Sequence, residues 1–162
     1  LWASSYFVQG RGIHADTAAS FASLFFLGIT FGRFLCGFFA EKLGDKRLIR
    51  IGIFTAMVGA VLIGLPVPFD GLALAGLITI GLGCAPIYPS IIHSTPFNFG
   101  KENSQSIIGI QMACAYVGTT LMPPLFGWLA SVAGIGLYPF YLLLFAVLML
   151  VMSERLNRAV AK

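Results

Sequence analysis

Few side chains in this sequence could bind a polar solute, and those few lie within long apolar segments. Trp2, Tyr6 and Gln9 recur at i, i+4 and i+7, a spacing that places them on one face of a helix. Aromatic rings beside an amide suit a carbohydrate, because the apolar faces of a sugar can stack on the rings while its hydroxyls bond to Gln9. A belt of aromatic residues at a membrane surface would give the same pattern, so both interpretations stay open.

Two residues that can carry positive charge are further candidates for binding a solute. Arg33 interrupts an apolar stretch and lies about 12 Å from Glu41 along a helix, a depth at which a guanidinium is costly. It could bind an oxygen or an anion of a substrate, or hold a neighbouring helix through backbone carbonyls. His93 follows Pro86 and Pro89 in phase and could relay a proton, but a wetted polar histidine near a helix end is the favoured interpretation.

Gln111 is the one amide that lies deep within the 51 uncharged residues between Glu102 and Glu154. An unpaired amide in hydrocarbon costs several kcal/mol, so its side chain should face a cavity or another helix. Tyr116 lies about 140° further around a helix and should not share that face. Gln111 is therefore the preferred ligand candidate in this segment.

The composition indicates that lipid is the solvent for most of these segments. Hydrophobic residues make up 58% of the 162 residues and charged residues only 10%, against roughly 25% in globular proteins. So little charge cannot solvate a surface, and we expect an integral membrane protein rather than a partner of nucleic acid, despite a net charge of +4. Cys36, Cys84 and Cys114 lie in apolar stretches without the spacing of a disulfide framework or a metal site.

Because a membrane span needs about 20 apolar residues, charged residues can mark the ends of the spans. We expect a partial helix over 1–10, a charged turn over 41–50 and five complete spans. The complete spans are 18–43, 51–67, 71–98, 106–130 and 137–153. The small residues Gly28 and Gly32, four apart, predict a close contact between helices. The fold class is therefore an all-α membrane protein.

Basic residues predict how these spans cross a cell membrane. If the 41–50 turn is cytoplasmic, eight Lys and Arg residues lie inside, and only Arg11 lies outside. The eight are Lys42, Lys46, Arg47, Arg50, Lys101, Arg155, Arg158 and Lys162. Such an excess is the positive-inside pattern. We therefore expect a multi-pass protein with a cytoplasmic C-terminus.

One charged motif lies in the turn between the first two complete spans. Gly37, Glu41, Lys42, Gly44, Lys46 and Arg47 fit the pattern G-x-x-x-[DE]-[RK]-x-G-x-[RK]-[RK]. The motif resembles the signature loop of the major facilitator superfamily, which joins helices 2 and 3 and recurs between helices 8 and 9. The rest of the chain resembles the C-terminal half of such a transporter, helices 7 to 12. This resemblance implies that the first helix is truncated and that a six-helix N-terminal half is missing.

The resemblance implies a conformational latch, and the residue types of the motif fit one. Gly37 would allow the close approach of a neighbouring helix, and Gly44 would permit a tight turn. Glu41 could face the positive N-terminal end of another helix, while the three basic residues hold the turn in the cytoplasm. A simple positive-inside anchor is the alternative, although it would require neither Glu41 nor the two glycines.

The leading hypothesis is half of a secondary active transporter that moves a small polar solute by alternating access. The stretch 81–96 resembles helix 10 and the stretch 100–111 resembles the entry to helix 11. Together with 2–6 at the end of helix 7, they are similar to the fucose-permease-like branch, which implies a sugar as substrate and a proton as coupling ion, without any other cofactor. The six carboxylates of this chain map to loops or span ends, so the coupling carboxylate should lie in the missing half. The alternatives are a membrane-embedded enzyme, for which converging acid and base groups are missing, and a structural membrane subunit.

Overall fold

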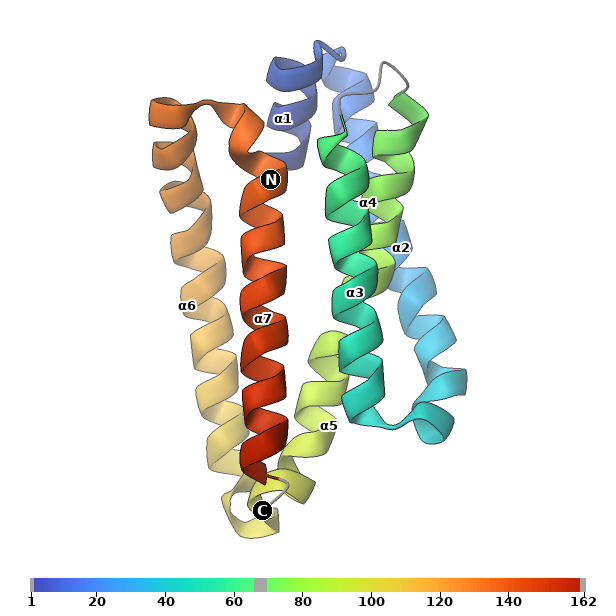
Figure 1. Ribbon diagram of the computed structural model, residues 1–162, viewed down its shortest axis with the longest axis vertical. Helices are drawn as coiled ribbons and strands as arrows, with labels where there is room; N and C mark the ends of the chain where they lie inside the picture. The colour runs from blue at the N-terminus through green and yellow to red at the C-terminus, as the bar shows by residue number, and fades with distance from the viewer. Residues whose placement is uncertain (1, 66–69, 161–162) are drawn as a thin grey trace.

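The described part of the molecule is built from helices and contains no strand. The computed structural model describes residues 2–65 and 70–160, apart from the side chains of Glu41 and Asp70. In chain order the elements are α1 (Trp2–Arg11), α2 (Ala15–Leu43), α3 (Asp45–Gly64), α4 (Asp70–Cys84), α5 (Ile87–Phe99), α6 (Lys101–Ala133), the 3₁₀ helix η1 (Ile135–Leu137) and α7 (Tyr138–Val160) (Figure 1). The all-α fold predicted from the sequence is therefore confirmed.

Five helical segments within the described ranges are long and apolar enough to cross a membrane. They are Ala15–Ala40, Asp45–Gly64, Gly71–Phe99, Lys101–Ala133 and Ile135–Val160. The remaining helix, α1, has 10 residues, which is about half of what a crossing needs. Each of the five complete spans expected from the sequence corresponds to one of these segments.

The ends of the helices differ from those predicted, because charged residues mark the membrane surface and do not end a helix. The segment 41–50, predicted as a turn, is helical on both sides of Gly44. Gly44 reverses the chain with a φ of +73°, in the left-handed region that glycine adopts at little cost. As a result, α3 begins at Asp45, well before the predicted start at Ile51.

Three other predicted spans are too short for the same reason. The span 106–130 is part of α6, which begins at Lys101 and continues to Ala133. The span 137–153 corresponds to α7, which continues to Val160. Charged and polar residues at these ends can extend a helix in water, where their side chains remain solvated. The start of 18–43 likewise moves to Ala15, whereas the predicted end of 51–67 lies outside the described residues.

The predicted span 71–98 is divided into two helices, α4 and α5, that meet at Ala85 and Pro86. Pro86 and Pro89 have no amide hydrogen, so the carbonyls four residues earlier lose their helical partners. Pro86 starts the new helix by accepting a hydrogen bond from the amide of Ser90 at 3.1 Å. These prolines therefore divide the predicted span into two helices, with the break at Ala85 and Pro86.

α4 packs between α2 and α3 through glycines that bring the backbones into direct contact. A Cβ built at Gly81 would lie 2.2 Å from the carbonyl oxygen of Phe25 on α2, and one built at Gly83 would lie 2.4 Å from the amide nitrogen of Ala56 on α3. No side chain larger than hydrogen fits at such distances. We call the set Gly28, Gly32, Gly52, Gly59, Gly81 and Gly83 the glycine seam. The contact predicted from Gly28 and Gly32 is thereby confirmed.

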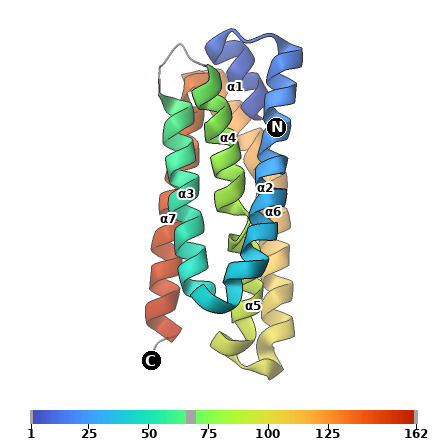
Figure 2. The ribbon, with the colours of Figure 1, turned by 90° about the vertical axis from the view of Figure 1, so that its right-hand side faces the viewer.

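The helices form a bundle with two distinct ends and two distinct sides. The α2–α3 turn, the α5–α6 turn and the C-terminal part of α7 lie at one end, which we call the Gly44 end (Figure 1). The α1–α2 joint lies at the opposite end, which we call the Arg11 end (Figure 1). Seen from the side, α2 and α6 run along one side of the molecule, and α3 and α7 run along the other (Figure 2).

Candidate functional site

A groove of about 610 Å³ lies between α2 and α5, next to the turn at the Gly44 end. We call it the α2–α5 groove. Its lining includes Arg33, Gly37, Gly44, Asp45, Ser90 and His93. The groove therefore brings together two residues that the sequence singled out as separate ligand candidates, Arg33 and His93, with both glycines of the signature motif.

Arg33 supplies a fixed positive charge to this groove. Its neighbour Gly32 belongs to the glycine seam, where an added Cβ would lie 2.6 Å from the Cβ of Ala85. The backbone at Arg33 is therefore held closely against α4, whereas its side chain is exposed. Within residues 2–65 and 70–160 the guanidinium makes no hydrogen bond or ion pair. Its charge is consequently available to a ligand, and no role in holding a neighbouring helix is seen in this part of the chain.

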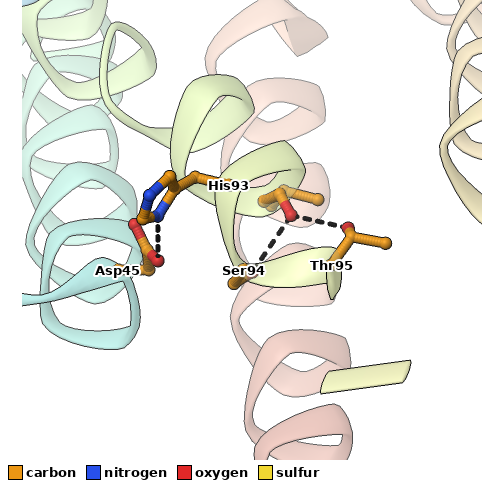
Figure 3. Close-up of polar contacts among 5 residues, drawn as sticks. Asp45, His93, Ser94 and Thr95 are labelled. Atoms are coloured by element: carbon orange, nitrogen blue, oxygen red, sulfur yellow. Dashed lines mark hydrogen bonds and ion pairs between the residues drawn. The ribbon is translucent and has the colours of Figure 1, made fainter. Parts of the chain in front are cut away.

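His93 pairs with a carboxylate that the sequence analysis did not select. Its Nδ1 lies 2.8 Å from Oδ2 of Asp45, the first residue of α3, as Figure 3 shows. The imidazole is 71% exposed, in keeping with the favoured interpretation of a wetted histidine near a helix end. Asp45 lies 48 residues earlier in the chain and occupies an unassigned position of the motif. No spacing rule connects the two, so only the fold reveals the pair.

The chemistry of the groove suits a polar organic solute. Arg33 offers donors, Asp45 offers acceptors, and the hydroxyl of Ser90 can do either, while Pro86 and Pro89 add apolar surface. The volume lies within the range of about 300–1,000 Å³ that is usual for small-molecule sites. Among the described residues, no group of three His, Cys, Asp or Glu side chains could hold a metal ion. The arrangement can bind and orient a solute, and within the described residues His93 bonds to Asp45.

Gln111 lies apart from this groove, on the other side of α5. Its Nε2 donates to Oγ1 of Thr95 at 3.2 Å, and Thr95 is 1% exposed. Of the two surroundings that the sequence allowed, a cavity or another helix, the structure gives both, since Gln111 bonds to α5 and lines a smaller cavity of about 210 Å³. That cavity contains neither Arg33 nor His93, so Gln111 does not line the same cavity as these two candidates.

The predicted face of Trp2, Tyr6 and Gln9 is not assembled over either of these two cavities. Nε1 of Trp2 donates to the carbonyl of Pro123 at 2.9 Å, and the hydroxyl of Tyr6 donates to the carbonyl of Ile63 at 3.3 Å. Gln9 is exposed. The two aromatic side chains thus tie α1 to α6 and α3, because their polar atoms bond to backbone carbonyls of the neighbouring helices.

Comparison with known proteins decides the family to which this bundle belongs. The sequence model of the Major Facilitator Superfamily matches residues 2–156. The chain belongs to the Major Facilitator Superfamily. Members of this family are membrane transporters and not enzymes. A search of curated proteins and a search of solved structures each found no match to the chain.

The signature turn of this Major Facilitator chain differs in part from the expected latch. Gly44 makes the tight turn that was predicted for it, with a positive φ. Gly37, however, has no atom of the described chain within 4 Å of an added Cβ, so the close approach expected there has no partner among the described residues. Lys42, Lys46 and Arg47 are exposed. The side chain of Glu41 lies outside the described residues, and its contact with a helix end stays a prediction.

Proposed function

We propose that this chain is the C-terminal half of a secondary active transporter that moves a sugar, or a related small polar solute, by alternating access. Its proposed partner is an N-terminal half of six helices, which would complete the cavity from the other side. One observation carries the proposal. In the α2–α5 groove, an arginine that makes no hydrogen bond or ion pair within the described residues lies in the same cavity as the glycines of the signature turn.

Sharing one cavity supports a coupling between solute binding and the state of the turn. Gly37 and Gly44 line the groove together with Arg33, so any movement of the turn alters the surroundings of the charge. A ligand shifts a conformational equilibrium only if it binds the two conformations unequally. A solute held by Arg33 would meet this condition, because the walls of its site change with the turn. The likeness of 2–6, 81–96 and 100–111 together to the fucose-permease-like branch is the support for a sugar.

The proposed orientation places the Gly44 end and the C-terminus in the cytoplasm of a cell. The α2–α3 turn, the α5–α6 turn and the end of α7 share this end (Figure 1). These segments carry Lys42, Arg47, Lys101 and Arg155, whereas Arg11 lies at the opposite end. An excess of basic residues in short loops favours the cytoplasmic side, which supports this orientation.

Counterflow in proteoliposomes tests the proposed transport. Vesicles containing the full-length protein are preloaded with an unlabelled sugar, and entry of the same labelled sugar is followed across a panel of hexoses and deoxyhexoses. We expect at least one sugar to exchange faster than in protein-free vesicles, and excess unlabelled sugar to compete with it. Exchange of none of the sugars, together with turnover of a lipid substrate, would favour a membrane enzyme instead.

A substitution in the groove connects this transport to the proposed site. We expect Arg33→Gln to weaken solute binding by roughly 10- to 150-fold, because a hydrogen bond to a charged group contributes about 1.5–3 kcal/mol. Arg155→Gln is the matched control, since this exposed arginine lies on α7 and outside the groove. Half-saturation concentrations from counterflow measure both variants. Equal losses in the two variants would show that Arg33 acts only through overall charge.

A further inference from the structure

A second cavity lies on the opposite side of α5 from the α2–α5 groove. It has a volume of about 210 Å³ and is lined by residues of α3, α5, α6 and α7 at the Gly44 end. Within the described part of the chain, the two cavities share no lining residue. In Figure 3, His93 points from α5 toward Asp45, whereas Thr95 points away from that pair. Thr95 bonds to Gln111 of α6, and both residues line the cavity. We call this space the α5–α7 cavity.

The polar lining of the α5–α7 cavity has unused capacity for hydrogen bonds. Asn98, Ser153 and Asn157 line the cavity, and their side chains make no hydrogen bond to any part of the chain that the structure describes. Gln111 uses one of its amide hydrogens on Thr95, and the second remains. Polar side chains gathered around one cavity without partners suit a ligand that carries several oxygen atoms.

The charges around the cavity favour an anion. Among the described residues that line it, Lys46 is the only charged one. The nearest carboxylates along the chain are engaged elsewhere: Glu154 forms an ion pair with Arg50 at 2.6 Å, and Asp45 pairs with His93 at 2.8 Å. An anion in the cavity would therefore meet one ammonium group and no competing carboxylate from the lining.

The rest of the lining is apolar, so a simple water-soluble anion would not match it. Met149, Met152 and Leu156 contribute from α7, and Ile49 and Phe99 contribute from α3 and α5. α7 belongs to a segment that is long and apolar enough to cross a membrane, so in a bilayer this apolar wall would continue toward the hydrocarbon region. The ligand best matched to the whole cavity has an anionic, oxygen-rich head and at least one hydrocarbon chain.

We propose that the α5–α7 cavity binds an anionic phospholipid of the surrounding bilayer. Lys46, Asn98 and Asn157 hold its phosphate and glycerol oxygens, and the acyl chains follow the methionines of α7 toward the membrane centre. The cavity is smaller than the about 300 Å³ at which sites for whole small molecules begin, so it takes the head and the first methylenes. Basic pockets between transmembrane helices at the cytoplasmic surface commonly hold anionic headgroups. This assignment gives Lys46 a role that its neighbour Arg47 does not share.

The test compares two adjacent cations of the signature turn. The full-length protein in detergent is titrated with phosphatidylglycerol or with phosphatidylcholine of the same acyl chains, and bound lipid is counted by native mass spectrometry. We expect the wild type to prefer phosphatidylglycerol. Lys46→Gln should lower that preference about fivefold, the factor that corresponds to the ~1 kcal/mol contributed by one basic residue near an anionic lipid. Arg47→Gln, which removes a charge outside the cavity, should leave it unchanged.

Two further arms make the outcome decisive. Ser153→Trp fills the cavity and should abolish the preference, whereas Val151→Trp adds the same bulk to an exposed position of α7 outside the lining and should not. Glycerol phosphate, the headgroup without chains, should not displace the lipid at equal concentration. The proposal is overturned if Lys46→Gln and Arg47→Gln act equally, if both tryptophan variants act equally, or if glycerol phosphate displaces the lipid.

Discussion

The glycine seam and the Gly44 end of this bundle are packed in contrasting ways. In the seam, neighbouring segments lie in direct contact, and a Cβ added at any of its six glycines would lie 2.7 Å or less from an atom of a neighbouring segment. At the Gly44 end, a Cβ added at Gly37 or Gly44 would meet nothing within 4 Å. Both cavities also open at this end, on either side of α5.

This contrast indicates where the chain can move and where it cannot. Helices in direct backbone contact leave no space for a shift in register, so α2, α3 and α4 behave as one unit along the seam. The turn at Gly44 lacks such contacts. A carrier that alternates between two conformations needs a rigid part that holds the solute site and a part that can change its neighbours, and the two regions fit these requirements.

The largest expected effect comes from breaking the seam. Gly81→Ala should destabilise the full-length protein by about 1–3 kcal/mol, because overpacking a tight contact carries a cost of this size and the new Cβ would lie 2.2 Å from a backbone carbonyl. Gly118→Ala is the control, since its Cβ would meet nothing within 4 Å. Thermal unfolding in detergent measures both. A Gly81→Ala variant as stable as the wild type would show that the glycine seam is not rigidly packed, and its contrast with the Gly44 end would be lost.

Sequence alone predicted the crossings of this bundle better than its site, for a physical reason. Hydropathy and charge report where the membrane begins, so the five crossings were found, but helix ends depend on a single backbone dihedral, as at Gly44. The pair of His93 with Asp45 and the bond of Gln111 to Thr95 depend on which helices pack together. Since helical neighbours in space can be far apart in sequence, no local pattern contains this information.

The same reasoning explains the fate of the predicted aromatic face. Periodicity placed Trp2 and Tyr6 on one side of a helix. The structure agrees, because Trp2 is half-buried and Tyr6 is buried against neighbouring helices. Periodicity does not show what lies opposite that side. In the structure, backbone carbonyls of Pro123 and Ile63 occupy the position expected for a sugar. A pattern of polar and aromatic residues thus indicates which side of the helix is inward, but not its partner.

An intermediate effect is expected at the Gly44 end of the bundle. Glu41→Gln should keep the full-length protein folded and shift its inward–outward equilibrium by a few-fold to roughly thirty-fold, since a charge at a helix terminus contributes about 0.3–1 kcal/mol when exposed and up to ~2 kcal/mol when partly buried. Cys36 lines the α2–α5 groove and provides the measurement. In a background with Cys84 and Cys114 replaced by serine, its rate of maleimide labelling should change.

Lys42→Gln serves as the matched control for that experiment, because it changes the net charge of the same turn by the same amount with the opposite sign. If Glu41 acts through a specific contact, the labelling rate of Cys36 should respond to Glu41→Gln more strongly than to Lys42→Gln. Equal and opposite responses would indicate that the turn senses only its total charge, which is the behaviour of a positive-inside anchor. The latch would then have to be abandoned.

The smallest effect is expected at His93, and it separates binding from proton coupling. A coupling group must titrate within the membrane barrier, whereas this imidazole is 71% exposed and pairs with Asp45 at the Gly44 end. Exposed ion pairs contribute about 0–1 kcal/mol, so His93→Gln should change counterflow and pH-driven accumulation alike, by about fivefold at most. Asp45→Asn removes the same ion pair through its other partner and should change both processes to the same extent as His93→Gln.

Counterflow that survives His93→Gln while pH-driven accumulation is lost would make His93 the coupling residue. If both processes persist, the expectation stands that the coupling carboxylate lies in the proposed N-terminal half, and that the Gly44 end of this chain acts through its shape and fixed charges.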